Sequence, residues 1–199
     1  MAVSLARRAA SVVACTPPPP WPLSVDAPSA KMFTLVIPRA PGRVLLGLKR
    51  RGFGQGLFNG FGGKVEPSDA SVAAAAAREL TEESGLTPHN LRRRGTLTFH
   101  WQESPLPWEV AVYDVSRWSG EPCVSDEMEP RWFQEADVPY AQMWADDVHW
   151  WPLFLRGDAF EGTFYFRQET QLVAHHLEVV PEGRMVELEA PLSNATAEL

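Results

Sequence analysis

Residues 62–86, with the sequence GGKVEPSDASVAAAAARELTEESGL, decide the fold of this chain. The alanines at positions 73–77 favour a helix by intrinsic propensity. Ser68 or Asp69 is expected to cap its start, because these side chains accept hydrogen bonds from the first free backbone N–H groups. Gly85 is expected to end it, because glycine readily adopts the left-handed conformation just past a helix. The sequence therefore predicts a helix between a glycine pair and Gly85.

Three carboxylates stand on one face of this predicted helix. Glu79, Glu82 and Glu83 are spaced i, i+3 and i+4, so they lie within about one turn of each other. Like charges at this spacing repel by a few tenths of a kcal/mol per pair, so they either stay in water or are neutralised by cations. A solvated acidic face is the ordinary interpretation of such a pattern. Three hard oxygen ligands also suit Mg²⁺ or Mn²⁺, which accept substrate phosphate oxygens as further ligands.

The whole stretch is more specific than its glutamates alone, and it resembles the Nudix box. That box consists of a glycine, five residues, a glutamate, seven residues, Arg-Glu, an aliphatic residue, any residue, Glu-Glu, any residue, a glycine and an aliphatic residue. The matching residues are Gly63, Arg78, Glu79, Leu80, Glu82, Glu83, Gly85 and Leu86. Asp69 replaces the early glutamate and lies one residue too far from Arg78. Both departures fall in the turn ahead of the helix, not among its three glutamates.

Strands outnumber helices in the rest of the chain. We expect a strand hairpin at 32–37 and 43–49 with a turn at 40–42, further strands at 94–102, 109–115, 160–167 and 172–180, and a short helix within 142–155. Strands and helices do not alternate regularly, which favours an α+β fold. The Nudix resemblance implies the same class: a mixed β-sheet sandwiched between helices, in three α/β/α layers. A chain of 199 residues with 45% hydrophobic residues is ample for this one domain, expected at 32–180.

The two ends differ from this domain. Residues 1–31 are expected to be a disordered extension, rich in Ala and Ser, without acidic residues before Asp26, and with four prolines at 17–20 that favour an extended linker. This composition is that of an organellar transit peptide, and an untargeted tail is the alternative. The expected location is cytoplasmic, or mitochondrial or plastid if residues 1–30 direct import. Residues 181–199 are expected to be a C-terminal tail.

The net charge of −7 argues against a general nucleic-acid or anionic-membrane surface. It is compatible with a small phosphorylated substrate held through metal ions. The two cysteines, Cys15 and Cys123, exclude a disulfide framework and a thiolate zinc site. No apolar run approaches the ~18 residues of a membrane span. We therefore expect a protein that binds neither nucleic acid nor membranes. The expected oligomeric state is a monomer, although the sequence does not specify it.

Residues 32–180 resemble one branch of the family, the MutT homologues that hydrolyse oxidised purine nucleoside triphosphates. The similar stretches are TLVIPRAPGRVLLGLKRRGFGQGLFNGFGGKV from Thr34, VSDEM from Val124, RWFQ from Arg131 and MWADDVHWWPLFL from Met143. The resemblance implies a small-molecule nucleotide substrate of the 8-oxo-dGTP and 2-oxo-dATP class. It implies metal-dependent hydrolysis to the monophosphate and pyrophosphate, which sanitises the nucleotide pool.

The resemblance also implies roles for individual residues at the phosphate end. The metal ligands would be Gly62, through its carbonyl, and Glu79, Glu82, Glu83 and Glu127, with Mg²⁺ as the cofactor and Mn²⁺ as an alternative. Glu82 is also a candidate base for the attacking water. Arg78 is expected to pair with Glu82, because Arg binds carboxylates bidentately. Lys49 and Lys64 are placed to meet phosphate, although either could be a surface lysine.

At the other end, the resemblance implies a purine pocket. Trp144 offers a flat face for base stacking, and Asn59 can donate and accept along a base edge. Asp146 and Asp147 are adjacent, so one acid can stay protonated and donate while its neighbour accepts, although an acidic helix start is the simpler interpretation. The implied substrate-binding set is Thr34, Lys49, Phe53, Asn59, Phe61, Gly62, Gly63, Lys64, Trp144, Asp146 and Asp147, with Phe99 also lining the pocket. Two residues depart from the branch: Trp108 replaces a smaller methionine, and Ala145 replaces a proline.

Two other functions stay open at this point. A Nudix hydrolase could act on another nucleoside diphosphate-linked substrate, and the set of Trp144, Asp146 and Asp147 argues against this. The fold could also serve as a non-catalytic nucleotide-binding module. The intact Glu79, Glu82 and Glu83 argue against a module, whereas the lengthened turn of the box is compatible with one.

Overall fold

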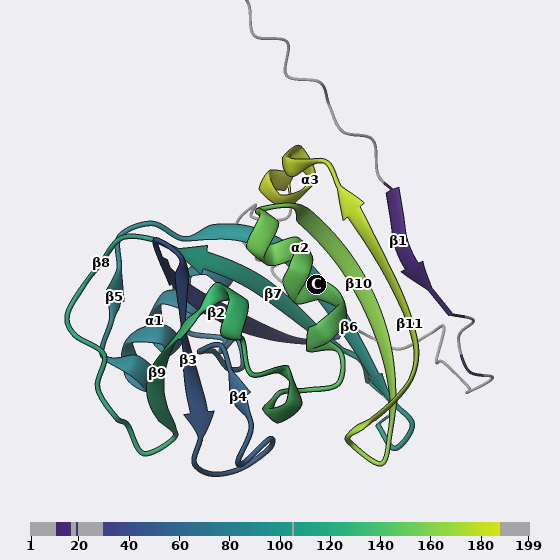
Figure 1. Ribbon diagram of the computed structural model, residues 1–199, viewed down its shortest axis with the longest axis horizontal. Helices are drawn as coiled ribbons and strands as arrows, with labels where there is room; N and C mark the ends of the chain where they lie inside the picture. Colours follow the sequence, from purple (N-terminus) through teal and green to yellow (C-terminus); the bar gives the residue numbers. More distant parts are fainter. Residues whose placement is uncertain (1–10, 17–18, 20–29, 105, 188–199) are drawn as a thin grey trace, which may run out of the picture.

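The computed structural model describes residues 11–16, 19, 30–104 and 106–187 (Figure 1). Its main helices are α1 (Val72–Ser84) and α2 (Asp147–Arg156), followed late in the chain by the short α3 (Glu182–Glu187). The strands are β1 (Ser11–Cys15), β2 (Lys31–Ala40), β3 (Arg43–Lys49), β4 (Phe58–Asn59), β5 (Thr87–Pro88), β6 (Arg92–Trp101), β7 (Trp108–Val115), β8 (Trp118–Ser119), β9 (Met128–Gln134), β10 (Ala159–Arg167) and β11 (Gln171–Val180). All six predicted strands and both predicted helices are present.

The described strands form one large mixed sheet and one small one. The large sheet has the order β1-β11-β10-β6-β7-β2-β3-β4, with β9 also paired to β3, and β5 pairs with β8 apart from it. β2 runs parallel to β7 and β6 parallel to β10, whereas the other pairs are antiparallel. The sheet is therefore mixed, as the sequence predicts.

The predicted hairpin of β2 and β3 is short and has a consequence for the site. The two strands pair only at Arg39–Val44 and Ala40–Arg43, next to Gly42 with its φ of 74°. Beyond these pairs, the glycine-pair segment takes the edge of β2, through isolated bridges from Phe61 to Val36 and from Lys64 to Phe33. The glycine pair is thereby held beside a central strand.

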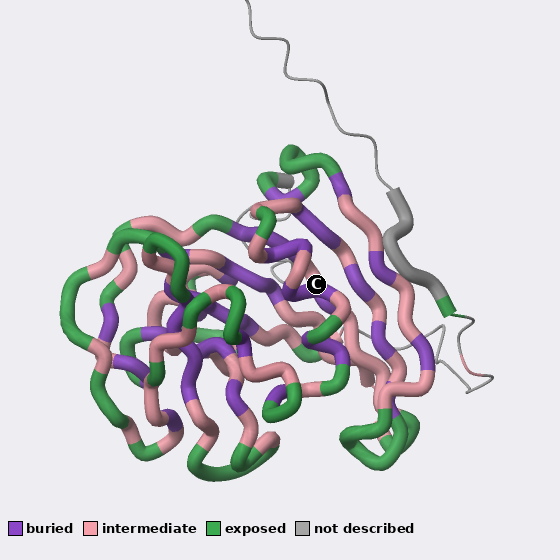
Figure 2. The backbone as a smooth tube through the Cα atoms, viewed as in Figure 1, coloured by how far each residue is buried: buried purple, intermediate pink, exposed green. Residues whose placement is uncertain are grey.

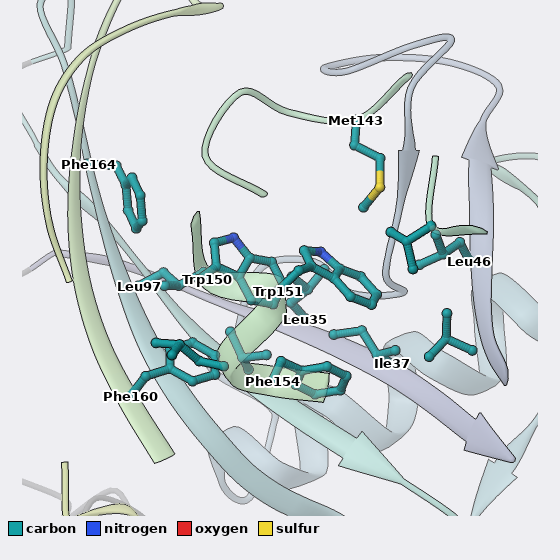
Figure 3. Packing of buried hydrophobic residues seen from close by; sticks show 14 of the residues in the cluster. Leu35, Ile37, Leu46, Leu97, Met143, Trp150, Trp151, Phe154, Phe160 and Phe164 are labelled. Atoms are coloured by element: carbon teal, nitrogen blue, oxygen red, sulfur yellow. The ribbon is translucent and has the colours of Figure 1, made fainter. Parts of the chain in front are cut away.

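The two faces of the sheet are covered by different helices. On β2, Val36 packs into the cluster that contains Leu80 of α1, whereas Leu35 and Ile37 pack into the cluster that contains Trp151 of α2. This alternation follows from the two-residue period of a strand. Figure 3 shows the tryptophans of α2 above Leu35 and Ile37, and Figure 2 shows that buried stretches follow the central strands. The predicted α/β/α layering is confirmed.

The cap of α1 differs from the expected one. Ser71, not Ser68 or Asp69, caps the helix, because its hydroxyl accepts a hydrogen bond from the N–H of Ala74 at 3.1 Å. Asp69 makes other contacts instead: it accepts a hydrogen bond from the N–H of Glu66 at 2.8 Å and forms an ion pair with Arg78 of the helix. At the other end, Gly85 adopts the expected left-handed conformation, with φ 77°.

Both ends of the chain hold more structure than expected. Residues 11–15, inside the extension predicted to be disordered, form β1 and pair with β11, for example Ser11 with Val179. In the segment expected to be a tail, α3 buries Met185 against Ala159 and Val180. Residues 1–10, 17–18 and 20–29 of the transit-peptide segment and residues 188–199 lie outside the described residues. Within the described residues, no helix is both long and apolar enough to cross a membrane.

Candidate active site

The glycine pair lets the helix carboxylates approach the backbone of β2. A side chain at Gly62 would overlap the carbonyl oxygen of Thr34, and the N–H of Gly62 donates to Oε2 of Glu83 at 2.8 Å. A Cβ atom at Gly63 would lie only 2.7 Å from the carboxylate carbon of Glu79. Both positions therefore need glycine for close packing against α1 and β2.

A cluster of opposite charges joins α1 to the loop before β9. The ammonium group of Lys49, at the end of β3, lies 3.2 Å from Oε1 of Glu83 and 2.9 Å from Oε2 of Glu127. The other oxygen of Glu127 accepts from Arg51 at 2.7 Å. The structure thus brings Glu127, which lies outside the box, together with a box glutamate around one cation.

Burial and charge act in opposite directions on this cluster. Burial raises the pKa values of Glu79 and Glu83, and the positive charge of Lys49 opposes this rise at Glu83. Burial disfavours the charged form of Lys49, but its contacts with Glu127 and Glu83 outweigh burial and raise its pKa. The hydrogen bond from Lys49 lowers the pKa of Glu127. The site therefore stabilises positive charge among its carboxylates.

Arg78 connects the turn of the box to its helix. Its Nε and Nη2 atoms each lie 3.0 Å from an oxygen of Asp69, which is a bidentate contact. Its Nη1 atom donates to Glu79 at 2.8 Å and to Glu82 at 3.2 Å. The expected contact with Glu82 is present, but Asp69 is the main partner, and Arg78 lowers its pKa. The longer turn therefore still brings this acid to the arginine.

The donor set of this cluster fits a hard divalent cation, although the side chains do not stand in a coordination geometry. Among the described residues, no group of three or more His, Cys, Asp or Glu is arranged to hold a metal ion. Glu83 and Glu127 nevertheless face the same point, where the ammonium group of Lys49 now lies. Carboxylate oxygens are the ligands that Mg²⁺ and Mn²⁺ prefer.

A cavity of about 460 Å³ begins beside this cluster. Its lining includes most of the substrate-binding residues expected from the sequence: Thr34, Lys49, Phe53, Asn59, Gly62, Gly63, Trp144, Asp146 and Asp147, together with Phe99, Trp108 and Glu127. Residues from both halves of the chain thus surround one space. Its volume lies within the usual range for small-molecule sites, about 300–1,000 Å³.

Two expected residues are not brought to this cavity. The side chain of Phe61 is fully buried in the cluster under α1, and Lys64 is exposed beside the turn of the box. Phe61 is held by its backbone instead, because its N–H donates to Val36 at 2.9 Å. Neither side chain is among the residues that line the described cavity.

Sequence reasoning missed several lining residues, among them Trp101, Trp150 and Phe166. Trp101 could have been found, because it lies two residues after Phe99 on β6 and so points to the same face. Trp150 and Phe166 carry no comparable signal, since their positions depend on how α2 and β10 pack on the sheet.

The two adjacent acids lie deep in the cavity wall at the start of α2. Asp146 and Asp147 are 3% and 2% exposed, so each is withdrawn from water. Asp146 accepts from the indole N–H of Trp150 at 2.9 Å, and Asp147 accepts from the N–H of Trp144 at 2.9 Å and from the indole of Trp151 at 3.2 Å. Burial raises the pKa of Asp146 to about 6 and, with the charge of its neighbour, raises that of Asp147 well above its usual value. The pair can therefore hold one proton near neutral pH.

This combination of a mixed sheet between helices, a glutamate-rich helix and a glycine pair defines the Nudix fold. A model of the NUDIX domain matches residues 30–154, so the chain belongs to the Nudix family and is a hydrolase of that class. A solved relative, the MutT protein from Bacillus halodurans, superposes with a TM-score of 0.66 at 25% identity, over 74% of this chain and 97% of that one.

Two curated relatives are more similar still. The oxidized purine nucleoside triphosphate hydrolase of Danio rerio is 44% identical over 154 residues, which cover 77% of this chain and 98% of that protein. The protein of the same name from Mus musculus is 40% identical over 152 residues, covering 76% and 97%. Both matches span nearly the whole of the relative.

Proposed function

We propose that this protein hydrolyses oxidised purine nucleoside triphosphates to the monophosphate and pyrophosphate, and so sanitises the nucleotide pool. One observation carries the proposal: a single cavity is lined at one end by the buried pair of Asp146 and Asp147 and at the other by Lys49 and Glu127. Lys49 in turn contacts Glu83 of the box. One end can read a base while the other holds the phosphates. The names of the two curated relatives support the substrate class.

At the phosphate end, the metal ligands are Glu79, Glu82, Glu83, Glu127 and the carbonyl of Gly62, with Mg²⁺ as the proposed cofactor and Mn²⁺ as its substitute. An ion held by these residues would supply Lewis-acid chemistry, which polarises a phosphoryl oxygen and lowers the pKa of water. Glu82, whose side chain is 60% exposed, has the best access to water and serves as the base, positioned by Arg78. Lys49 leaves its carboxylates and neutralises phosphate.

At the base end, Trp144 stacks on the purine and the acid pair reads its edge. Oxidation changes the pattern of donors and acceptors on a purine. A protonated Asp147 donates a hydrogen bond, and an ionised Asp146 accepts one, in a site with little water. A mismatched base would leave a buried polar group unpaired, which typically costs about 1–3 kcal/mol. The normal purine is therefore disfavoured.

The first test is pyrophosphate release from 8-oxo-dGTP and from dGTP, with Mg²⁺ and with chelator. Wild-type protein should turn over the oxidised nucleotide preferentially and only with metal, and Glu83→Gln should lose this activity. Glu178→Gln, on the distant strand β11, is the matched control and should keep it. Absence of turnover with both nucleotides would refute the proposed substrate class.

The protein is further proposed to act on free nucleotides, because a net charge of −7 disfavours contact with nucleic acid. Its proposed oligomeric state is a monomer. Its proposed location is the cytoplasm, with a mitochondrion or plastid as the alternative if residues 1–30 direct import. Sedimentation of the purified chain and imaging of the full-length protein with and without these residues would test both statements.

A further inference from the structure

One cation of the cavity wall has no part in the proposed function. Arg51 lies in the loop that connects β3 to β4, and it is one of the residues that line the cavity. Its side chain is 63% exposed, whereas that of Lys49 is 18% exposed. Among the described lining residues, Lys49 and Arg51 are the only cations. Arg51 is therefore the outer member of a pair of positive charges.

Arg51 is joined to the proposed phosphate end through Glu127. Its Nη2 atom donates to Oε1 of this carboxylate at 2.7 Å, while the ammonium group of Lys49 lies 2.9 Å from Oε2. The two cations therefore stand on either side of one acid. Because Lys49 is withdrawn from water and Arg51 is not, a row of phosphates that extends from the cavity towards solvent reaches Lys49 first and Arg51 last.

The guanidinium group of Arg51 has hydrogen-bond donors to spare. Arginine carries five N–H groups in a planar fork. In the described part of the chain, the side chain of Arg51 makes a single hydrogen bond, the one to Glu127. Two parallel hydrogen bonds from such a fork match the oxygens of a phosphate group. Arg51 can therefore bind a phosphate and keep its contact with Glu127.

The preceding residue, Arg50, has the same charge but a different position. Its side chain donates to the backbone carbonyl of Ser125 at 2.6 Å, and it is not among the residues that line the described cavity. Its backbone N–H donates to the carbonyl of Glu127 at 2.8 Å, which fixes the start of the loop beside this acid. Of two adjacent arginines, one therefore lines the cavity and the other holds the loop before β9.

We infer that Arg51 binds the terminal phosphates of the substrate, and that it thereby gives the protein a preference for triphosphates over shorter nucleotides. This inference rests on the proposed function, which places the phosphates at the end of the cavity near Lys49 and Glu127. A monophosphate meets Lys49 and does not extend to Arg51. The choice of base is unaffected, because Asp146 and Asp147 lie at the other end.

The expected size of the effect follows from the charge and the exposure of Arg51. Hydrogen bonds between ionised groups are about twice as strong as neutral ones, whereas solvent weakens an exposed ion pair. We expect Arg51 to strengthen binding of a triphosphate by about tenfold and to leave binding of a monophosphate unchanged. A lysine at this position keeps the charge but lacks the fork, so it should give only part of the effect.

The test is Arg51→Gln, measured by calorimetric binding of 8-oxo-dGMP and of a non-hydrolysable imido analogue of 8-oxo-dGTP, both with Mg²⁺. The affinity for the analogue relative to the monophosphate should fall about tenfold, and the KM for 8-oxo-dGTP should rise by a similar factor. Arg51→Lys should give an intermediate ratio. Arg50→Gln removes the same charge from the neighbouring residue and should keep the ratio within about twofold. An unchanged ratio in Arg51→Gln, or an equal change in Arg50→Gln, would overturn the inference.

The same measurements separate this inference from the proposed function. If the ratio of affinities depends on Arg51 but no triphosphate is hydrolysed, the proposed function fails and the inference stands. If 8-oxo-dGTP is hydrolysed in preference to dGTP and the ratio is the same in Arg51→Gln, only the inference fails. If the wild-type protein binds neither ligand, both fail.

Discussion

Arg78 shows how a single residue can hold the reactive part of the box together. Its guanidinium reaches Asp69 through two hydrogen bonds and reaches Glu79 and Glu82 through its remaining nitrogen. Two proposed metal ligands therefore share one positioning residue. A lysine has the same charge but lacks the planar fork that makes these contacts together.

We accordingly expect Arg78→Lys to lower turnover by about 10- to 100-fold, the usual cost of removing a residue that orients metal ligands. Asp69→Asn should have a smaller effect in the same direction, because it weakens the hold on Arg78. Steady-state pyrophosphate release would measure both. Arg156→Lys, at the exposed end of α2, is the control. Activity of Arg78→Lys within twofold of wild type would contradict the positioning role.

The acid pair predicts a pH dependence of base binding. Burial raises the pKa of Asp146 to about 6, so this acid is neutral below that pH and ionised above it. Asp147 keeps its proton to a higher pH, because burial and the charge of Asp146 raise its pKa well above the usual value. The mixed pair that reads the oxidised base therefore forms as pH rises through about 6. Affinity for the nucleoside 8-oxo-deoxyguanosine should increase over this range. The nucleoside is preferred because a phosphate itself titrates near pH 6.

The matched variant is Asp146→Asn, which cannot ionise and should flatten this profile. Its preference for the oxidised over the normal nucleoside should also fall. If Asp146→Asn and Asp147→Asn both kept the wild-type preference, the acid pair would have no part in reading the base. The same linkage has an effect on stability: a raised folded pKa favours the folded state at low pH, and this contribution is lost as pH rises from about 4 to about 6.

At the scale of elements, the glycine pair and α1 work as one unit. The three atoms nearest to a Cβ at Gly63 all belong to the carboxylate of Glu79, which is the far end of a flexible side chain. Gly63→Ala should therefore move that carboxylate without unfolding the protein. A displacement of about 1 Å at a catalytic group can cost about 10²-fold in rate. We expect a loss of that order in turnover, with little change in thermal stability.

Gly183→Ala in α3 is the matched control, because no atom of the described residues, apart from its chain neighbours and the backbone of its own helix, lies within 4 Å of the position that its Cβ would take. Both turnover and stability should therefore be kept. If Gly63→Ala kept full activity, the close approach of Glu79 to the glycine pair would be unimportant. If it unfolded the chain, the close approach would be structural and not catalytic.

The cap of α1 gives a prediction about stability alone. Ser71→Ala removes a hydrogen bond to the N–H of Ala74 and should lower the free energy of unfolding by about 1 kcal/mol. Ser68→Ala, at one of the positions that the sequence favoured for the cap, should stay within about 0.5 kcal/mol of wild type. Urea denaturation of the two variants would measure the difference. Equal effects would leave Ser71 without its capping role.

For the whole molecule, the sequence predicted what depends on local patterns. Gly85, the glutamate helix and all six strands follow from propensity, spacing and turn residues. The cap moved to Ser71 because a tertiary contact, from Asp69 to Arg78, competes with local capping. The strand at residues 11–15 was missed because its short apolar run lies in a segment whose composition is that of a tail.

In the candidate site, too, local patterns predict some features, whereas others depend on tertiary structure. The box and the acid pair could be placed together only through resemblance to a known family, since they lie far apart in the sequence. Phe61 was assigned to the cavity through the family resemblance of the stretch that contains it, but its side chain is buried under α1. The ring contacts of Phe53 with three tryptophans of the cavity, Trp101, Trp108 and Trp144, depend on the path of a glycine-rich loop, which no local pattern specifies.

The arrangement of the two halves predicts that metal and base binding are separable. The carboxylates lie on α1 and the loop before β9, whereas Asp146 and Asp147 are anchored by indoles of α2 on the opposite face of the sheet. Divalent ions should raise the melting temperature of the wild-type protein, since a ligand at 100 times its dissociation constant adds about 2.7 kcal/mol to the free energy of unfolding. Glu83→Gln should weaken this effect.

Removing the ion with chelator should therefore stop hydrolysis and lower the melting temperature. The affinity for 8-oxo-deoxyguanosine should stay within about twofold, because a nucleoside has no phosphate group for the metal to bind. Calorimetric titration of the nucleoside with and without chelator measures this directly. Asp147→Asn provides the converse case: nucleoside binding should weaken while the metal-dependent rise in melting temperature stays. Loss of nucleoside binding on chelation would mean that the carboxylate cluster also shapes the base pocket, so that the two ends of the cavity form one cooperative site.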